Sequence, residues 1–344
     1  MLSEKEQNAE TIMINPNIPL IDLHRHLDGS VRLETILDLG RQHDLPLPAW
    51  DIETLKPFIQ IDKQTPGVMA FIAKFKWMVG VLVDYDACFR IAYENVEDAT
   101  KEGLDYVELR FSPFFMAEPH RLDLAGVVEA VTAGVREGEK DFGIHANLIG
   151  IISRTYGVES GWKELESLLT QREHLVGLDL AGDEINYPAY LFVEHFKKAR
   201  DAGWAVTIHA GESSGADSVW QAIRDLGAVR IGHAVRAIDD PELIDYMLEN
   251  GIAIETNLTS NLQTMTVTDL SQHPAKKFLE RGLLVTLNTD NTGISGIDLA
   301  HEYNIAAPAA GLSPDQIRQA QLNAVEVAFL SKEEKADLYK QVKQ

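Results

Sequence analysis

The sequence is poor in several features whose absence limits what the chain can be. It contains a single cysteine, Cys88, so no disulfide can form within the chain and no cysteine-rich zinc site can be built. It has 31 lysines and arginines but 53 aspartates and glutamates. This excess of negative charge disfavours nucleic acid as a partner, because phosphate binding requires clustered cations. No apolar run is long enough to cross a bilayer, and the acidic start MLSEKEQNAE does not resemble a signal peptide. We therefore expect a cytoplasmic protein with neither nucleic acid nor a membrane as partner.

The chain has instead a regular alternation of short, β-rich apolar segments with helical segments. Helical apolar spacing is clear at residues 124–143 and 241–251, and glycines often follow such segments, as expected at the end of a helix. The alternation predicts a parallel sheet, and eight such units in a chain of this length predict a (β/α)8 TIM barrel. A doubly wound sheet is the alternative, but no Gly-x-Gly-x-x-Gly follows the first segment. The β-rich segments are residues 19–27, 105–113, 145–153, 175–184, 205–212, 230–235, 252–261 and 284–293.

Polar side chains stand where these predicted strands end. In a TIM barrel the chemistry lies at the carboxyl ends of the strands. The residues at those ends are His24, His26, Arg110, Ser112, Ser153, Arg154, Gly182, Asp183, Glu184, His209, Glu212, His233, Asn257, Asn261, Asn288, Asp290 and Asn291. A pair such as His24 and His26, which points to one face of a strand, often only lines a solvated surface. Several histidines and acids buried at one rim are harder to explain in that way, because each would be costly to desolvate without a partner.

One set of four residues has the composition of a metal site. His24, His26, His209 and Asp290 offer three nitrogens and one oxygen, which suits a divalent ion such as zinc, and a single full set implies one ion per chain. His145 is a rival ligand, but it begins its segment and is expected at the opposite end of the barrel, in a structural role.

Two further residues complete the predicted chemistry. Glu212 follows His209 by three positions, close to the metal without competing for it, and a carboxyl group in a dry pocket can act as a general acid. His233 is expected to hydrogen-bond the water that the metal activates. The constellation indicates hydrolytic chemistry, since no catalytic triad, P-loop or cytidine-deaminase signature is present.

The domain organisation follows from the same pattern. Residues 1–17 are expected to form a flexible N-terminal tail, and residues 18–344 a single metal-dependent hydrolase barrel domain. The stretch between the first two β-rich segments, residues 28–104, is far longer than one crossover helix requires. It predicts extra helices inserted after strand 1, which would cover the site as a lid.

From residue 18 to about residue 335 the motifs LHRHLDGS, VELRFSP, LDLAGDE, IHAGE, IGHAV, LTSN and LNTDN occur in this order. In this the chain resembles the adenosine deaminases of the amidohydrolase superfamily, the bacterial ones in particular. The resemblance implies zinc-dependent hydrolysis of adenosine and 2′-deoxyadenosine to inosine or 2′-deoxyinosine and ammonia, in purine salvage, by a monomer whose partner is a purine nucleoside. It implies that the zinc ligands are His24, His26, His209 and Asp290. It also implies that Glu212 protonates N1 of the purine and that His233 orients the water. The substrate contacts that it implies are His26 and Asp28 to the ribose, Gly182 to N3 and Asn291 to N7.

The sequence departs from the family pattern at three positions. Asn291 stands where many members have a second aspartate, Thr292 replaces a common proline, and Ala234 replaces a glycine, so that its methyl group could crowd the pocket. Two alternatives therefore stay open. The substrate could be a different 6-aminopurine, such as adenine or an N6-substituted or modified adenine nucleoside. The chain could also be an inactive nucleoside-binding protein, although the complete ligand set argues against that.

Overall fold

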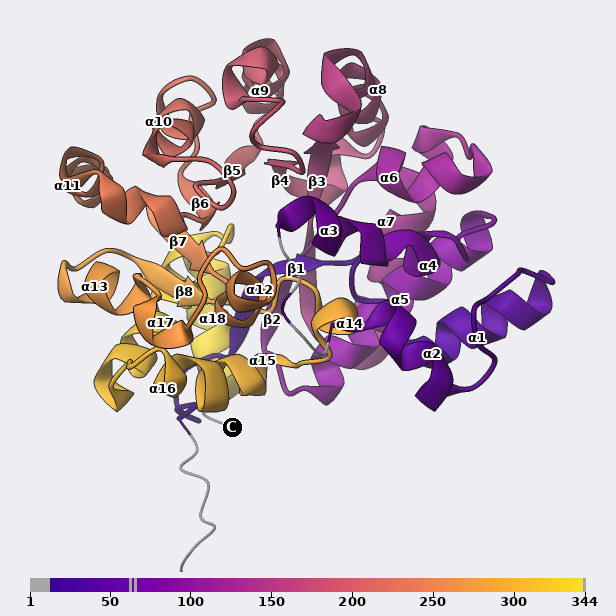
Figure 1. Cartoon of the computed structure of the whole chain (residues 1–344), viewed down its shortest axis with the longest axis horizontal. Helices are drawn as coiled ribbons and strands as arrows, with labels where there is room; N and C mark the ends of the chain where they lie inside the picture. Colours follow the sequence, from indigo (N-terminus) through magenta and orange to yellow (C-terminus); the bar gives the residue numbers. More distant parts are fainter. Residues whose placement is uncertain (1–12, 62–63, 65–66, 343–344) are drawn as a thin grey trace, which may run out of the picture.

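In the computed structural model, which describes residues 13–61, 64 and 67–342, eight parallel strands follow one another in chain order around a barrel (Figure 1). Each begins within one of the predicted β-rich segments, so the predicted (β/α)8 barrel is confirmed. The strands are β1 (Ile21–His26), β2 (Tyr106–Phe111), β3 (His145–Ser153), β4 (Leu175–Ala181), β5 (Ala205–Ala210), β6 (Arg230–His233), β7 (Ala253–Thr256) and β8 (Val285–Leu287).

The barrel closes where its first and last strands meet. Just beyond β8, Asp290 forms a parallel bridge with Arg25 of β1. The backbone N–H of His26 donates to the carbonyl of Asp290 over 2.7 Å, and the N–H of Asp290 donates to the carbonyl of His24 over 2.8 Å. The seam of the barrel therefore places Asp290 beside both histidines of β1.

Helices surround the barrel (Figure 1), and the ends of several of them follow ordinary capping rules. The predicted helix at 124–143 is α7 (Leu124–Phe142), which begins after the capping side chain of Asp123 and ends at Gly143 with φ 73°. The predicted helix at 241–251 is α11 (Pro241–Asn250), and Gly251 follows it with φ 64°. The others beyond β2 are α6 (Pro113–Ala117), α8 (Gly157–Leu169), α9 (Val193–Asp201), α10 (Ala216–Arg224), α12 (Leu258–Gln263), α13 (Ala275–Glu280), α14 (Thr292–Ser295), α15 (Leu299–His301), α16 (Ala307–Ala309), α17 (Pro314–Val327) and α18 (Lys332–Val342).

The predicted insertion after β1 is helical. It contains α1 (Leu33–Gln42), α2 (Ile52–Ile59), α3 (Val68–Ile72), a 3₁₀ turn (Ala73–Phe75), α4 (Lys76–Val79) and finally α5 (Tyr85–Lys101), which packs along α7. Phe71, Phe75 and Met78 of this insertion are buried, so these large apolar side chains serve packing. Helix α3 lies near the barrel opening in Figure 1, in the position expected of a lid.

The interior of the barrel is charged rather than purely apolar. Arg110 lies 2.9 Å from Asp179 and 2.9 Å from Glu255, while Arg230 lies 2.7 Å from Glu255 and also pairs with Glu108. All five side chains are buried. Because an unpaired charge is costly in such a place, each is held by an opposite charge. This ionic layer lies on strands β2, β4, β6 and β7, beneath the strand ends.

The described part of the expected tail is attached to the barrel domain. Residues 1–12 lie outside the described residues. The N–H of Met13 donates to Asn304 Oδ1 over 2.8 Å, and that of Asn15 donates to Gln321 Oε1 over 3.0 Å. Among the helices of the described residues, none combines the length and the apolar character that a membrane span requires.

Candidate functional site

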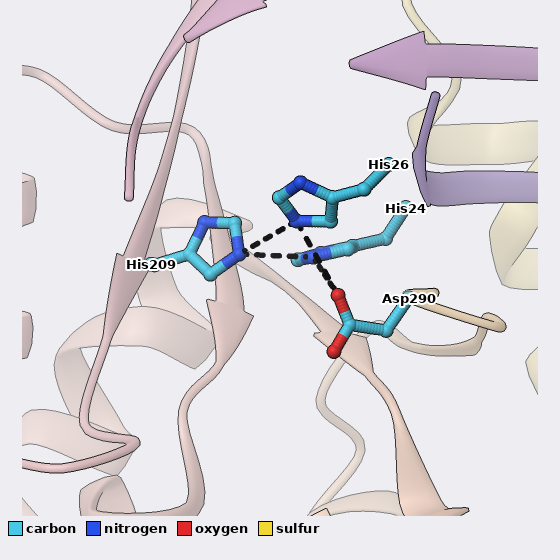
Figure 2. Close-up of side chains that lie close together, drawn as sticks. All are labelled: His24, His26, His209 and Asp290. Carbon is cyan, nitrogen blue, oxygen red and sulfur yellow. Dashed lines mark hydrogen bonds and ion pairs between the residues drawn. The ribbon is translucent and has the colours of Figure 1, made fainter. Parts of the chain in front are cut away.

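The four predicted metal ligands converge at the carboxyl ends of β1, β5 and β8 (Figure 2). Nε2 of His209 lies 3.1 Å from Nε2 of His24 and 3.2 Å from Nε2 of His26. Oδ1 of Asp290 lies 3.4 Å and 3.3 Å from the same two nitrogens of β1. All four ligand atoms lie within 4.8 Å of one another, and all four residues are buried.

The donor set fits a divalent metal ion. Ligands about 2.0–2.1 Å from a tetrahedral zinc ion are about 3.3–3.4 Å apart, close to the separations between the imidazole nitrogens and the carboxylate. Neutral imidazole is the form that binds a metal, and its second nitrogen then carries the proton. His24 Nδ1 lies 2.8 Å from Glu255 Oε2, and His209 Nδ1 lies 2.9 Å from Asp179 Oδ2. Since these carboxylates can only accept, both Nε2 lone pairs are left free for the ion.

The two carboxylates behind the histidines are held in the ionised form. Burial alone would raise the pKa of Asp179, but His209 and Arg110 outweigh it and hold that pKa below its ordinary value. Burial likewise opposes ionisation of Glu255, yet Arg110 and Arg230 keep its pKa well below the usual range. A single guanidinium, that of Arg110, thus links the carboxylate partners of two different metal ligands.

Glu212 lies at the turn that follows β5, and the buried carboxylate of Glu184 organises that turn. Glu184 accepts hydrogen bonds from the backbone N–H groups of residues 211, 212, 213 and 214, at 2.6, 3.2, 2.9 and 3.1 Å. Burial, with the nearby charges of Asp290 and Glu184, raises the pKa of Glu212 well above its ordinary value, against the opposing charge of Arg154. Glu212 is therefore suited to carry a proton at neutral pH.

His233 ends β6 in a strained backbone conformation. Its φ is 65°, and the following residue, Ala234, has φ 53° and is fully buried. Burial lowers the pKa of His233 well below its ordinary value, so the ring is neutral. Its Nδ1 lies 2.9 Å from Asn261 Nδ2 and 3.7 Å from Glu212 Oε1. Positive φ angles at non-glycine residues next to reactive groups are typical of functional sites.

Most of the predicted site residues share a small cavity beneath the inserted helices. The insertion contributes Val68, Phe71, Ile72 and Phe75 to its wall. The chemistry-bearing residues of the wall are His26, Gly182, His209, Glu212, His233, Ser260, Asp290 and Asn291. The apolar wall from α3 and the 3₁₀ turn excludes water from one side of this cavity.

A second, larger chamber adjoins the first. It shares His26 and Gly182 with the metal cavity, while Asp28 and Ser112 line only the larger chamber. Asp28 Oδ2 accepts from the backbone N–H of Ser112 over 3.1 Å, and its Oδ1 lies 3.8 Å from His26 Nδ1. Of the described residues that line either chamber, none is a lysine or an arginine.

Two backbone features shape the floor of these chambers. Gly182 has φ 110°, and a Cβ there would lie 2.4 Å from Thr155 Oγ1, so both the conformation and the space require glycine. A Cβ at Gly29 would lie 1.9 Å from Asn291 Oδ1, which is buried and has no hydrogen-bond partner among the described residues. The amide oxygen of Asn291 thus packs against Gly29.

Several sequence expectations are modified by these positions. Ala234 and Thr292 are not among the described residues that line the two chambers, so the methyl group of Ala234 does not crowd the pocket. Its effect is instead on the backbone, because Ala234 has a positive φ, which an alanine adopts less readily than a glycine. Asn261 was expected to end the seventh strand, but β7 stops at Thr256 and Asn261 lies on α12. His145 begins β3 and bonds to Glu139 over 2.8 Å, on the amino-terminal side of that strand.

The sequence reasoning missed three supporting residues, two of which lie directly behind metal ligands. Asp179 and Glu255 lie within apolar strands, in LDL and IET, and a charged residue facing inward from such a strand is the signal that could have identified them. Their charges cannot be solvated there and must serve a partner. His273 is buried, and its Nε2 lies 3.1 Å from Asn261 Oδ1, a contact that no sequence pattern predicts.

Comparisons with known proteins agree with this geometry. A family model described as "Adenosine deaminase" matches residues 19–344. The chain is 58% identical to a protein named adenosine deaminase from Vibrio parahaemolyticus, over 96% of this chain and 99% of that protein. Two solved structures are each 24% identical and support the fold alone. They are an adenine deaminase from Arthrobacter aurescens, with TM-score 0.87 over 95% of this chain and 98% of that one, and a zinc-bound amidohydrolase from Burkholderia ambifaria, with TM-score 0.86 over 98% and 94%.

Proposed function

The chain belongs to the adenosine deaminase family, and from that premise we propose that it converts adenosine and 2′-deoxyadenosine, with water, into inosine or 2′-deoxyinosine and ammonia. The observation that carries the proposal is a single small cavity that is lined by three of the four candidate metal ligands, His26, His209 and Asp290, and by the largely buried carboxyl group of Glu212. A binding protein would need neither a complete ligand set nor a carboxyl group with a raised pKa.

We propose that the four ligands hold one zinc ion per chain. When bound, zinc lowers the pKa of a water molecule toward neutrality and so supplies the nucleophile for attack at C6 of the purine. The residues of the chain provide the rest. Asp179 and Glu255 keep the imidazoles of His209 and His24 oriented, because each accepts from the Nδ1–H of its histidine.

Glu212 is proposed to be the general acid that donates a proton to N1 of the purine. Attack at C6 places negative charge on N1, and a proton delivered there removes that charge as the tetrahedral carbon forms. The raised pKa of Glu212, which burial causes, supports this role because the side chain retains its proton at neutral pH. Glu184 holds the turn and so fixes where that proton is presented.

The remaining cavity residues are proposed to orient the base. The amide oxygen of Asn291 packs against Gly29, and this supports its NH2 group as the donor toward N7 of the purine. An amide donates at any pH, whereas an aspartate would have to be protonated. Gly182 lets the substrate approach the backbone closely and is proposed to contact N3.

A nucleoside fits the two chambers better than free adenine or a nucleotide. Free adenine would fill only the metal cavity, whereas a ribose extends into the adjoining chamber, where His26 and Asp28 can bond its hydroxyl groups. A 5′-phosphate would meet Asp28 there and no lysine or arginine among the described lining residues. Behind the chamber Glu164 accepts from Ser112 Oγ over 2.5 Å and from the backbone N–H of Ser153 over 2.8 Å.

The test is an ultraviolet assay of the zinc-loaded protein against adenosine, 2′-deoxyadenosine, adenine, N6-methyladenosine and adenosine 5′-monophosphate. We expect the two nucleosides to have the highest kcat/KM. A higher value for adenine or for the nucleotide would overturn the substrate assignment, and no turnover of any compound by protein with full zinc would overturn the activity. The Glu212→Gln variant controls for a contaminating deaminase. The monomeric state is also proposed, and light scattering tests it.

A further inference from the structure

We infer that Asn261 and His273 form a hydrogen-bond relay that fixes the tautomer of His233, so that its neutral ring carries the proton on Nε2. The relay itself follows from hydrogen-bond geometry. Only its effect on turnover rests on the proposed function, in which His233 lies beside the reacting water.

The relay begins at a group whose role is unambiguous. The backbone N–H of Ala275 donates to Nδ1 of His273 over 3.1 Å, and a backbone N–H cannot accept. His273 is buried, and burial lowers its pKa to about 3, so the ring is neutral and has one proton. Because Nδ1 is the acceptor, that proton is on Nε2.

The proton on His273 then decides which way the next amide faces. Nε2 of His273 lies 3.1 Å from Oδ1 of Asn261, so the N–H donates to the amide oxygen. The NH2 group of Asn261 must therefore face His233, and it donates to Nδ1 of that ring over 2.9 Å. Both Asn261 and His233 are buried, so water does not compete for these bonds.

A neighbouring amide does not set the tautomer in the same way. Asn257 Nδ2 lies 3.4 Å from Nδ1 and 3.5 Å from Nε2 of His233. Being nearly equidistant from both nitrogens, it faces the carbon between them and favours neither. The shorter contact from Asn261 therefore decides where the proton lies.

Helix α12 gives the relay a fixed position. The N–H groups of Leu258 and Thr259, at the start of α12, donate to the buried carboxylate of Glu302 over 3.1 Å each. With Nδ1 occupied and Nε2 protonated, His233 has no free lone pair. It therefore acts toward the reacting water as a hydrogen-bond donor and not as a base, and Asn261 and His273 are positioning residues.

The relay can be tested directly by nitrogen NMR of the zinc-loaded protein with 15N-labelled histidine. Two-bond proton–nitrogen correlations distinguish a protonated from an unprotonated ring nitrogen. We expect Nδ1 of His233 to be unprotonated in the unmodified chain. Asn261→Asp replaces the donor by an isosteric acceptor, so Nδ1 of His233 should gain a proton. A protonated Nδ1 in the unmodified chain, or an unchanged signal in the variant, would overturn the relay.

Kinetics of the same variant measure the consequence. With a wrong tautomer we expect kcat for adenosine to fall by roughly 10²- to 10⁴-fold, while KM changes by only a few fold because the cavity is intact. An unchanged kcat with a reversed tautomer would overturn the positioning role. If no adenosine turnover exists at all, the NMR result still stands, so the relay and the proposed function can fail separately.

Variants of His273 supply the matched comparison. His273→Gln keeps a side-chain N–H that can donate to Asn261 Oδ1 and should retain the tautomer of His233. His273→Leu removes the donor, so Asn261 can rotate and both tautomers should be populated. His195→Leu is the control, because His195 is equally buried but bonds to Val158 over 3.0 Å, away from the site. If His273→Leu gives the same spectrum as the unmodified chain, His273 does not orient the amide of Asn261, and its part in the relay is overturned.

Discussion

Asp179→Asn is expected to weaken zinc binding without removing any ligand. Asp179 Oδ2 lies 2.9 Å from His209 Nδ1 and 2.9 Å from Arg110. The amide of the variant can still accept one hydrogen bond, but it carries no charge. His209 would lose the negative partner that makes its Nε2 a stronger ligand, and Arg110 would retain Glu255 as its other buried anion.

The magnitude follows from the position of Asp179 directly behind one ligand. Changes to residues that orient a metal ligand typically weaken metal binding by about 10- to 100-fold, which is about 1.4–2.7 kcal/mol. At a fixed free zinc concentration well above the dissociation constant, the free energy of unfolding of the loaded protein should fall by the same amount. The variant also loses one buried charge pair, and this lowers the free energy of unfolding whether or not zinc is bound.

The assay is competition for zinc against a coloured chelator, together with urea unfolding with and without zinc. Glu108→Gln is the matched control, because Glu108 is a buried acid of the same ionic layer that pairs with Arg230 and touches no ligand. It should lower the free energy of unfolding yet leave zinc affinity within about twofold. Equal zinc affinity for Asp179→Asn and the unmodified chain would refute the reasoning. An equal loss of zinc affinity in Asp179→Asn and Glu108→Gln would refute it as well.

Other predictions concern the ligands and the substrate. His24→Ala and Asp290→Ala should each release zinc and abolish turnover, and metal analysis of the purified variants checks this. Glu212→Gln should bind zinc normally but lower kcat by roughly 10²- to 10⁴-fold, because an amide cannot deliver a proton; near-normal kcat would mean that another group protonates N1. 7-Deazaadenosine, which cannot accept at position 7, should have a kcat/KM roughly fivefold to more than a hundredfold below that of adenosine, since a donor left unpaired costs about 1–3 kcal/mol. Asn291→Ala should remove that preference, and equal rates with the unmodified chain would refute the contact. Gly182→Ala should raise KM strongly, because the added Cβ would lie 2.4 Å from Thr155 Oγ1.

The barrel and the ligand set were predictable from sequence for one physical reason. Strand ends are marked by a change from apolar to polar residues, and parallel strands bring those ends to one rim. His24, His26, His209 and Asp290 each stand at such a change, so their convergence did not depend on the details of packing. The long segment before β2 similarly predicted inserted helices, because no single crossover fills it.

The supporting residues could not be predicted because their roles depend on register and on side-chain rotation. Asp179 and Glu255 matter because β4 and β7 place them behind particular histidines. Asn261 matters because the chain turns into α12 after Thr256, and the apolar pattern does not mark that boundary. Ala234 was interpreted as crowding the pocket, whereas its positive φ shows that the cost of this residue is conformational.

The seam of the barrel, where Asp290 pairs with Arg25 of β1, has a consequence for how the chain folds. The other neighbouring strands pair residues at most 85 positions apart, whereas this contact joins residues 265 positions apart. Loop-closure entropy grows by about 0.6 kcal/mol for each doubling of length, so joining the ends costs about 2 kcal/mol more than closing one βα unit. The seam should be the last contact to form, and in metal-free protein the amides of His26 and Asp290 should exchange with solvent before those of β3 and β4. An ion bound by His24, His26 and Asp290 would join the first strand of the barrel to the segment that follows the last.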